Sequence, residues 1–134
     1  MNLKSLIFLA VLTLIISSCN TRKAAKSTSP YLTEQESEPE IVVQKEKIKL
    51  VDDPNGTVHR YYVIIGSFKA IDNARQYRTD IINKGFAPVI LENENGLYRI
   101  SVGGYDDESA ARTQISQIRK KFSDHSDVWL LVRK

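Results

Sequence analysis

Two stretches in the C-terminal half of this 134-residue chain repeat one another at a spacing of 37 residues. Each runs from an apolar, β-branched segment through a glycine and an aromatic residue into a segment with helical spacing. The matched positions are Gly66 and Gly103, Phe68 and Tyr105, Ala74 and Ala111, Arg75 and Arg112, Ile81 and Ile118, and Lys84 and Lys121. A duplicated strand–helix unit restricts the fold, because both copies must bury their apolar sides in one common core.

The spacing of apolar residues predicts the elements of this region. Strands are predicted at 61–67, 86–91, 97–102 and 128–132, with a tight turn at Asn95 and Gly96 between the second and the third. Helices are predicted over 72–84, with Asp72 as N-cap and Gly85 as the stop, and over 107–122. The order β-α-β-β-α-β predicts an α+β fold, a four-stranded antiparallel sheet with both helices on one face, as in ferredoxin-like and RNA-recognition domains.

Strand parity divides the side chains between the two faces of this sheet. Residues such as Val63, Ile65, Ile100 and Leu130 are predicted to lie under the helices. The opposite face then carries Tyr62, Ile64, Leu97, Arg99, Ser101, Trp129 and Leu131. We expect this face to be uncovered, and it is too apolar to be an ordinary solvated surface, which favours a binding function.

The N-terminal residues predict export. Lys4 precedes an apolar run over 6–16, interrupted by Thr13, which is too short to span a bilayer. Small residues lead from this run into Cys19, the only cysteine. This resembles the lipobox of bacterial lipoproteins, which implies a signal peptide over 1–18 and acyl chains (such as palmitate) that anchor Cys19 in a membrane. A chance cysteine in an ordinary cleavable signal peptide is the alternative; Asn20 favours the outer membrane, facing the periplasm.

The next segment, residues 19–58, predicts a flexible linker. It is poor in aromatic residues, rich in Ser, Thr, Glu and Lys, and contains three of the four prolines. Such a composition buries too little apolar surface to offset the entropy of ordering. Within it, residues 41–43 and 48–51 are apolar enough for a short strand or a docking segment. The predicted domain then comprises residues 59–134.

Residues that carry catalysis or bind metals are not found in a suitable pattern. Asp106, Asp107 and Glu108 are adjacent at a helix start, where carboxylates cap the helix and interact with its dipole. His59 and His125 lack carboxylates at metal-binding spacing, so solvated or capping roles are predicted for them. We therefore predict a non-enzymatic protein without metal or cofactor.

The segments YYVIIGSF, NA, KGFAPVI, GLYRISVGGY, AA and DVWLLV resemble the SPOR family of peptidoglycan-binding modules over residues 59–134. The resemblance implies the same fold, and it implies binding of septal glycan strands whose stem peptides amidases have removed, in cell division or envelope maintenance. The positions that it implies for ligand contact are Ile64, Ser67, Leu97, Arg99 and Trp129, and Tyr62 adds an aromatic platform. Ile64 stands where the family often has a polar residue, and Leu97 where an aromatic residue can occur.

Two other functions fit the same face. It could dock proteins of the division machinery or the envelope, amidases included. RNA binding fits the topology, and residues 59–134 have 12 basic and 9 acidic residues. However, the basic-Gly-aromatic motif of RNA-recognition domains is absent, and the export signal removes the chain from cytoplasmic RNA. We therefore expect no nucleic-acid partner.

Overall fold

The computed structural model describes residues 38–134. The predicted signal peptide, Cys19 and the first part of the predicted linker lie outside the described residues. The elements are β1 (Val43–Glu46), β2 (Ile48–Leu50), β3 (Tyr61–Phe68), α2 (Ile71–Asn83), β4 (Val89–Asn93), β5 (Tyr98–Tyr105), α3 (Glu108–Lys121), a short 3-10 helix (Ser123–His125) and β6 (Trp129–Arg133). Within residues 38–134, no helix has the length and apolar character needed to cross a membrane.

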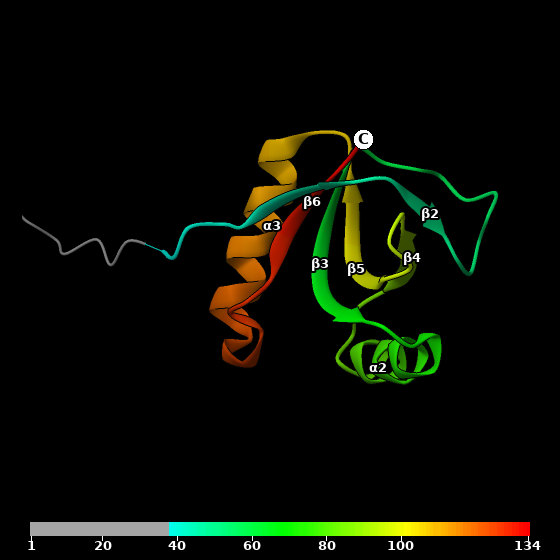
Figure 1. Cartoon of the computed structure of the whole chain (residues 1–134). Helices are drawn as coiled ribbons and strands as arrows, with labels where there is room; N and C mark the ends of the chain where they lie inside the picture. Colours follow the sequence, from blue (N-terminus) through cyan, green and yellow to red (C-terminus); the bar gives the residue numbers. More distant parts are fainter. Residues whose placement is uncertain (1–37) are drawn as a thin grey trace, which may run out of the picture. The chain divides into compact units, whose positions relative to one another are not determined.

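Four strands form the centre of the sheet in the order β6-β3-β5-β4, and all their pairings are antiparallel. This confirms the predicted α+β fold and its β-α-β-β-α-β order (Figure 1). The turn between β4 and β5 also agrees with the prediction. The Asn93 side-chain oxygen accepts hydrogen bonds from the N–H groups of Asn95 and Leu97, and Gly96 has a φ of 73°, a conformation that glycine adopts without strain.

The main core lies between this central sheet and the two helices. The strands contribute residues of one parity and the helices contribute their apolar stripes. Its buried members are Val63, Ile65, Ala74, Ile81, Ile90, Ile100, Ala111, Ile115, Ile118, Val128 and Leu130. Both helices therefore cover the same face of the sheet, as predicted.

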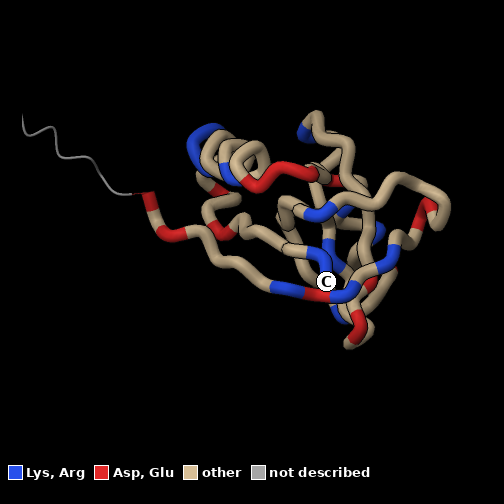
Figure 2. The backbone as a smooth tube through the Cα atoms, turned by 90° about the horizontal axis from the view of Figure 1, so that it is seen from above, with Lys and Arg blue, Asp and Glu red and all other residues tan. Residues whose placement is uncertain are grey.

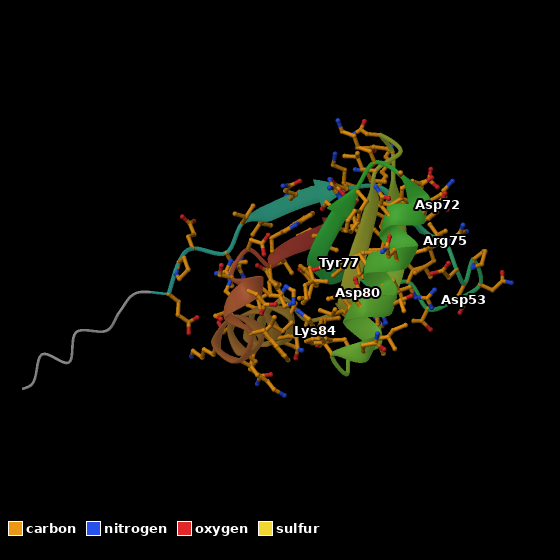
Figure 3. All side chains as sticks on the ribbon, turned by 90° about the horizontal axis from the view of Figure 1, so that it is seen from below. Asp53, Asp72, Arg75, Tyr77, Asp80 and Lys84 are labelled. Atoms are coloured by element: carbon orange, nitrogen blue, oxygen red, sulfur yellow. The ribbon has the colours of Figure 1, made fainter. Side chains whose placement is uncertain are left out.

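The two helices begin differently. Asp107 caps α3 as predicted, because its Oδ2 accepts a hydrogen bond from the Ala110 N–H at 2.8 Å. The prediction that Asp72 caps α2 is wrong: Ala70 is the N-cap and makes no side-chain bond, so Asp72 lies inside the first turn. On the same helix Tyr77 turns toward the sheet, and its hydroxyl donates to the Ile65 carbonyl oxygen at 3.2 Å (Figure 3).

The sheet has six strands instead of the predicted four. β1 pairs in parallel with β6 at one edge, and β2 pairs antiparallel with β4 at the other edge. Both strands come from the segment predicted as linker, so the boundary predicted at residue 59 excludes two strands of the sheet. The physical reason is that edge pairing uses backbone groups, which a strand can supply even where its side chains are mostly polar and exposed.

Candidate functional site

A second apolar cluster fills the sheet face that points away from the helices. Its buried members are Tyr62, Ile64, Leu91 and Leu131, and Trp129, Ile48 and Leu50 pack against it. The predicted parity is therefore correct, because Tyr62, Ile64, Leu131 and Trp129 lie together on this face. The prediction that the face is uncovered is wrong, since Tyr62 is only 1% exposed and Ile64 is completely buried.

Residues 41–51, which we call the strap, cover this face. At the β6 edge the Val42 carbonyl oxygen accepts a hydrogen bond from the Leu130 N–H at 2.9 Å. At the β4 edge the Val51 N–H donates to the Ile90 carbonyl oxygen, also at 2.9 Å. Only Lys47 separates β1 from β2, so the chain passes directly from one edge of the sheet to the other across the second cluster (Figure 1).

A buried ion pair joins the strap to the sheet. The Glu46 carboxylate accepts two hydrogen bonds from Arg99, one from Nε at 3.1 Å and one from Nη2 at 2.5 Å. The Glu46 and Arg99 side chains are only 11% and 10% exposed. The guanidinium group also lies 5.3 Å from the centroid of the Trp129 ring, which is a cation–π contact. Arg99, predicted as a ligand donor, therefore already holds a carboxylate of its own chain.

Glu46 is the residue of this site that sequence reasoning missed. It lies between the two apolar pieces 41–43 and 48–51, and a lone acidic residue in such a strand-like segment is a weak indication of a buried partner. Its partner Arg99 is 53 residues away, and no local pattern connects the two.

The remaining predicted contact residues lie at different depths. Ser67 is exposed and is paired with Arg99 in the β3–β5 register, while Leu97 and Trp129 are half-buried. Ile64 is paired with Trp129 in the β3–β6 register but lies wholly inside the second cluster. The structure thus brings Trp129 against the Arg99 guanidinium group and Ser67 opposite Arg99 in the sheet, and it places Ile64 beneath the strap.

Tyr62 also lies beneath the strap, and its hydroxyl marks one end of the cluster. This hydroxyl accepts a hydrogen bond from the His59 N–H at 2.8 Å. An open pocket of roughly 210 Å³ lies beside it, between the loop that follows the strap and the end of β5. Its lining includes Leu50, Asp53, Thr57, His59, Tyr62, Gly103 and Gly104.

The His59 ring is held near this pocket by Asp106. The His59 Nδ1 lies 3.3 Å from Asp106 Oδ2, and the Arg60 N–H donates to Oδ1 at 3.1 Å. The Arg60 N–H and then the His59 ring lower the pKa of Asp106 below its ordinary value. His59, which lines the pocket, thus has the Asp106 carboxylate as its side-chain partner.

His125 differs from its predicted solvated or capping role. It is only 6% exposed, and its Nε2 lies 2.8 Å from the Lys84 Nζ. Lys84 in turn donates to Asp124 at 2.8 Å, and this bond is the main cause of a lowered Asp124 pKa. Lys84, at the end of α2 (labelled in Figure 3), is thus joined to the short 3-10 helix through Asp124 and His125.

Basic and acidic residues both occur throughout the described part of the domain. Basic and acidic residues are interspersed along the chain from residue 38 onward (Figure 2). In the strap itself, Lys45, Glu46, Lys47 and Lys49 stand close together, and Lys49 pairs with Glu92 at 2.9 Å. Among residues 38–134, no group of three or more potential ligand side chains is placed to hold a metal ion.

The comparison with protein families decides what kind of domain this is. The family model described as SPOR domain matches residues 58–126. The chain belongs to the SPOR domain family. Neither the curated proteins nor the solved structures include a match to the chain. SPOR domains are binding modules for peptidoglycan and are not catalytic, so a general peptidoglycan-binding role follows for this chain.

The family match also separates the strap from the rest of the domain. It begins at residue 58, so the whole strap precedes it, whereas β3, α2, β4, β5 and α3 lie within it. Glu46 is thus outside the matched region, and Arg99 is inside it.

Proposed function

We propose that this SPOR domain recognises glycan strands without stem peptides, as they occur at the division septum, through the sheet face that carries Arg99 and Trp129. The observation that carries the proposal is the guanidinium group stacked 5.3 Å from an indole ring on that face of a SPOR domain. An aromatic ring packs against the apolar faces of sugars, and a guanidinium fork binds a carboxylate with two parallel hydrogen bonds.

The chemistry of the glycan supports a preference for stripped strands. Hydrolysis of the amide between a stem peptide and its sugar leaves a free carboxylate on the glycan. An intact strand presents a neutral amide at that position, which is a weaker partner for a guanidinium group. Arg99 already binds a carboxylate in a bidentate manner, so the same group on a stripped strand matches its geometry.

A binding assay tests this function. The full chain, purified in detergent, is mixed with intact sacculi, with amidase-treated sacculi and with RNA, and the bound fraction is measured by co-sedimentation or filter retention. We expect binding to sacculi to rise after amidase treatment. Equal binding to both sacculi would contradict the preference for stripped glycan, and stronger binding to RNA would favour the nucleic-acid alternative.

The proposal includes attachment to the cell envelope through a lipid on Cys19, with the domain on the periplasmic side of the outer membrane. Several acyl chains are needed for stable anchoring, since each buried methylene contributes about 0.8 kcal/mol and a single chain binds reversibly. Cells given radiolabelled palmitate should label the wild-type chain and not the Cys19→Ser variant. Fractionation then locates the labelled chain, and its recovery with the inner membrane would contradict the sorting inferred from Asn20.

A further inference from the structure

Three properties of the strap make it separable from the domain. The four central strands pair with one another without it, and the main core is built from residues 63–130. The strap lies outside the region matched by the SPOR family. Within the strap, contacts with the main core are confined to its two ends, Ile41 and Val51. Removing the strap therefore exposes the second cluster, whereas the four central strands keep their pairings and the helices keep their packing on the main core.

The interior of the strap is held mainly by backbone hydrogen bonds and by Glu46. The side chains of Val43, Gln44 and Lys45 in β1 are exposed, and Glu46 is the buried residue of that strand. In β2, Ile48 and Leu50 are partly buried on the second cluster. A segment with few buried apolar contacts opens at a lower free energy than a core strand.

Contacts with α3 hold the chain just before the strap. The Arg119 Nη1 donates to the Pro39 carbonyl oxygen at 2.7 Å, and Glu38 pairs with Lys120 at 2.7 Å. Both contacts are made by α3, which packs on the opposite face of the sheet from the second cluster. A strap that leaves the sheet face can therefore stay attached at residues 38–40 and return to the same place.

From these observations we propose that the strap is an intramolecular competitor for the glycan site, in which the Glu46 carboxylate occupies the position on Arg99 that a carboxylate of the glycan takes. This proposal rests on the proposed function. Tyr62, Ile64 and the guanidinium group of Arg99 are not available while the strap is closed. Ligand binding and strap closure thus exclude one another, and the apparent affinity is the affinity of the open form reduced by the fraction of molecules that are open.

Competition of this kind accounts for the burial of an ionisable residue, Glu46, in the strap. A strap held by an apolar residue in place of Glu46 would be displaced by any ligand that covers the cluster. With Glu46, the arginine is left unpaired when the strap opens, and only a ligand that supplies an anionic group restores its partner. The strap then makes binding more selective for glycan that carries free carboxylates.

The first test opens the strap by mutation. Co-sedimentation with amidase-treated sacculi compares the wild-type chain, Glu46→Ala and the matched control Lys45→Ala, which changes an exposed neighbour. We expect Glu46→Ala to bind at least about tenfold more tightly, which corresponds to about 1.4 kcal/mol, and Lys45→Ala to bind like the wild type. Emission of Trp129, the only tryptophan, should shift to longer wavelength in unliganded Glu46→Ala, because its surroundings become wetter.

The second test closes the strap with a disulfide. Lys49 and Glu92 are paired neighbours of β2 and β4, so Lys49→Cys with Glu92→Cys, in a Cys19→Ala background, joins the strap to the sheet. Oxidation should weaken binding to amidase-treated sacculi at least about tenfold, and reduction should restore it. The Lys49→Ala, Glu92→Ala chain, treated with the same oxidant, controls for the lost ion pair.

The two tests separate the failure of this proposal from the failure of the proposed function. If the oxidised, cross-linked chain binds amidase-treated sacculi as well as the reduced chain, the strap does not compete with the glycan, and the proposal is overturned while the binding function stands. If no form binds, the opened Glu46→Ala chain included, the proposed function itself is overturned.

Discussion

The buried pair of Glu46 and Arg99 offers a direct test of whether the strap is docked in solution. Replacing Arg99 by Met leaves the Glu46 carboxylate, 11% exposed, without its partner, and replacing Glu46 by Leu leaves the guanidinium group unpaired. Removal of one member of a buried ion pair costs about 3 to 5 kcal/mol, whereas replacement of both by apolar residues is often nearly neutral. The double variant Glu46→Leu, Arg99→Met is therefore expected to be more stable than either single variant.

The unfolding free energy that a single variant loses cannot exceed the docking free energy of the strap. The reason is that an opened strap returns the unpaired charge to water. We expect each single variant to lose about 3 kcal/mol of unfolding free energy, or the docking free energy of the strap if that is smaller. For a domain of this size about 3 kcal/mol lowers the Tm by on the order of 10–20 °C. We expect the double variant to lie within about 1 kcal/mol of the wild type.

Urea unfolding followed by circular dichroism and by Trp129 fluorescence measures these differences. The wild type, the two single variants and the double variant form a double-mutant cycle, which gives the coupling free energy between Glu46 and Arg99. If both single variants lose less than about 1 kcal/mol, as variants of solvent-exposed ion pairs do, then the Glu46–Arg99 pair does not hold the strap on the sheet.

Three further predictions concern other parts of the domain. A fluorescently tagged Trp129→Ala chain should no longer gather at the septum, and its circular dichroism spectrum should match that of the wild type. If the tagged variant still gathers at the septum, this face is not the binding site. Asp107→Ala should lower the unfolding free energy by about 1 kcal/mol through loss of the α3 cap, and thermal unfolding beside the uncapped Asp72→Ala control checks it. The folded-state pKa of Asp106 is depressed, so the stability it contributes is present above pH 3.8 and is lost as the pH falls through the lower, folded value. Carbon-13 titration by NMR should give a midpoint below 3.8, and a midpoint at or above that value contradicts the contacts with Arg60 and His59.

Much of the fold was predictable because its determinants are local. The alternation in residues such as Val63 and Ile65, and the helical spacing of Ala111, Ile115 and Ile118, directed these side chains to the main core. The turn at Gly96 and the cap at Asp107 depend on residues close in the chain. The start of α2 was misplaced because Asp72 is a good cap by residue type, whereas the helix already begins at Ile71.

The candidate site was only partly predictable. Parity was enough to place Tyr62, Ile64 and Trp129 on one face, but their exposure depended on a segment elsewhere in the chain. The strap reaches the sheet edges through backbone hydrogen bonds, which leave little mark on side-chain composition, and β1 pairs with β6, more than 80 residues later. Its mixture of Lys, Glu and Gln is as typical of a linker as of an edge strand.

The sequence by itself determined which side chains share a face, because alternation along a strand and spacing along a helix are properties of neighbouring residues. It also determined the two-copy order of strands and helices. Only the tertiary structure decided that the second face is covered and that Arg99 is paired with Glu46 across 53 residues. The reason is that burial and charge pairing depend on which segments folding brings together. Here two short edge strands, mostly polar in β1 and with Ile48 and Leu50 in β2, cover a face that would otherwise be open.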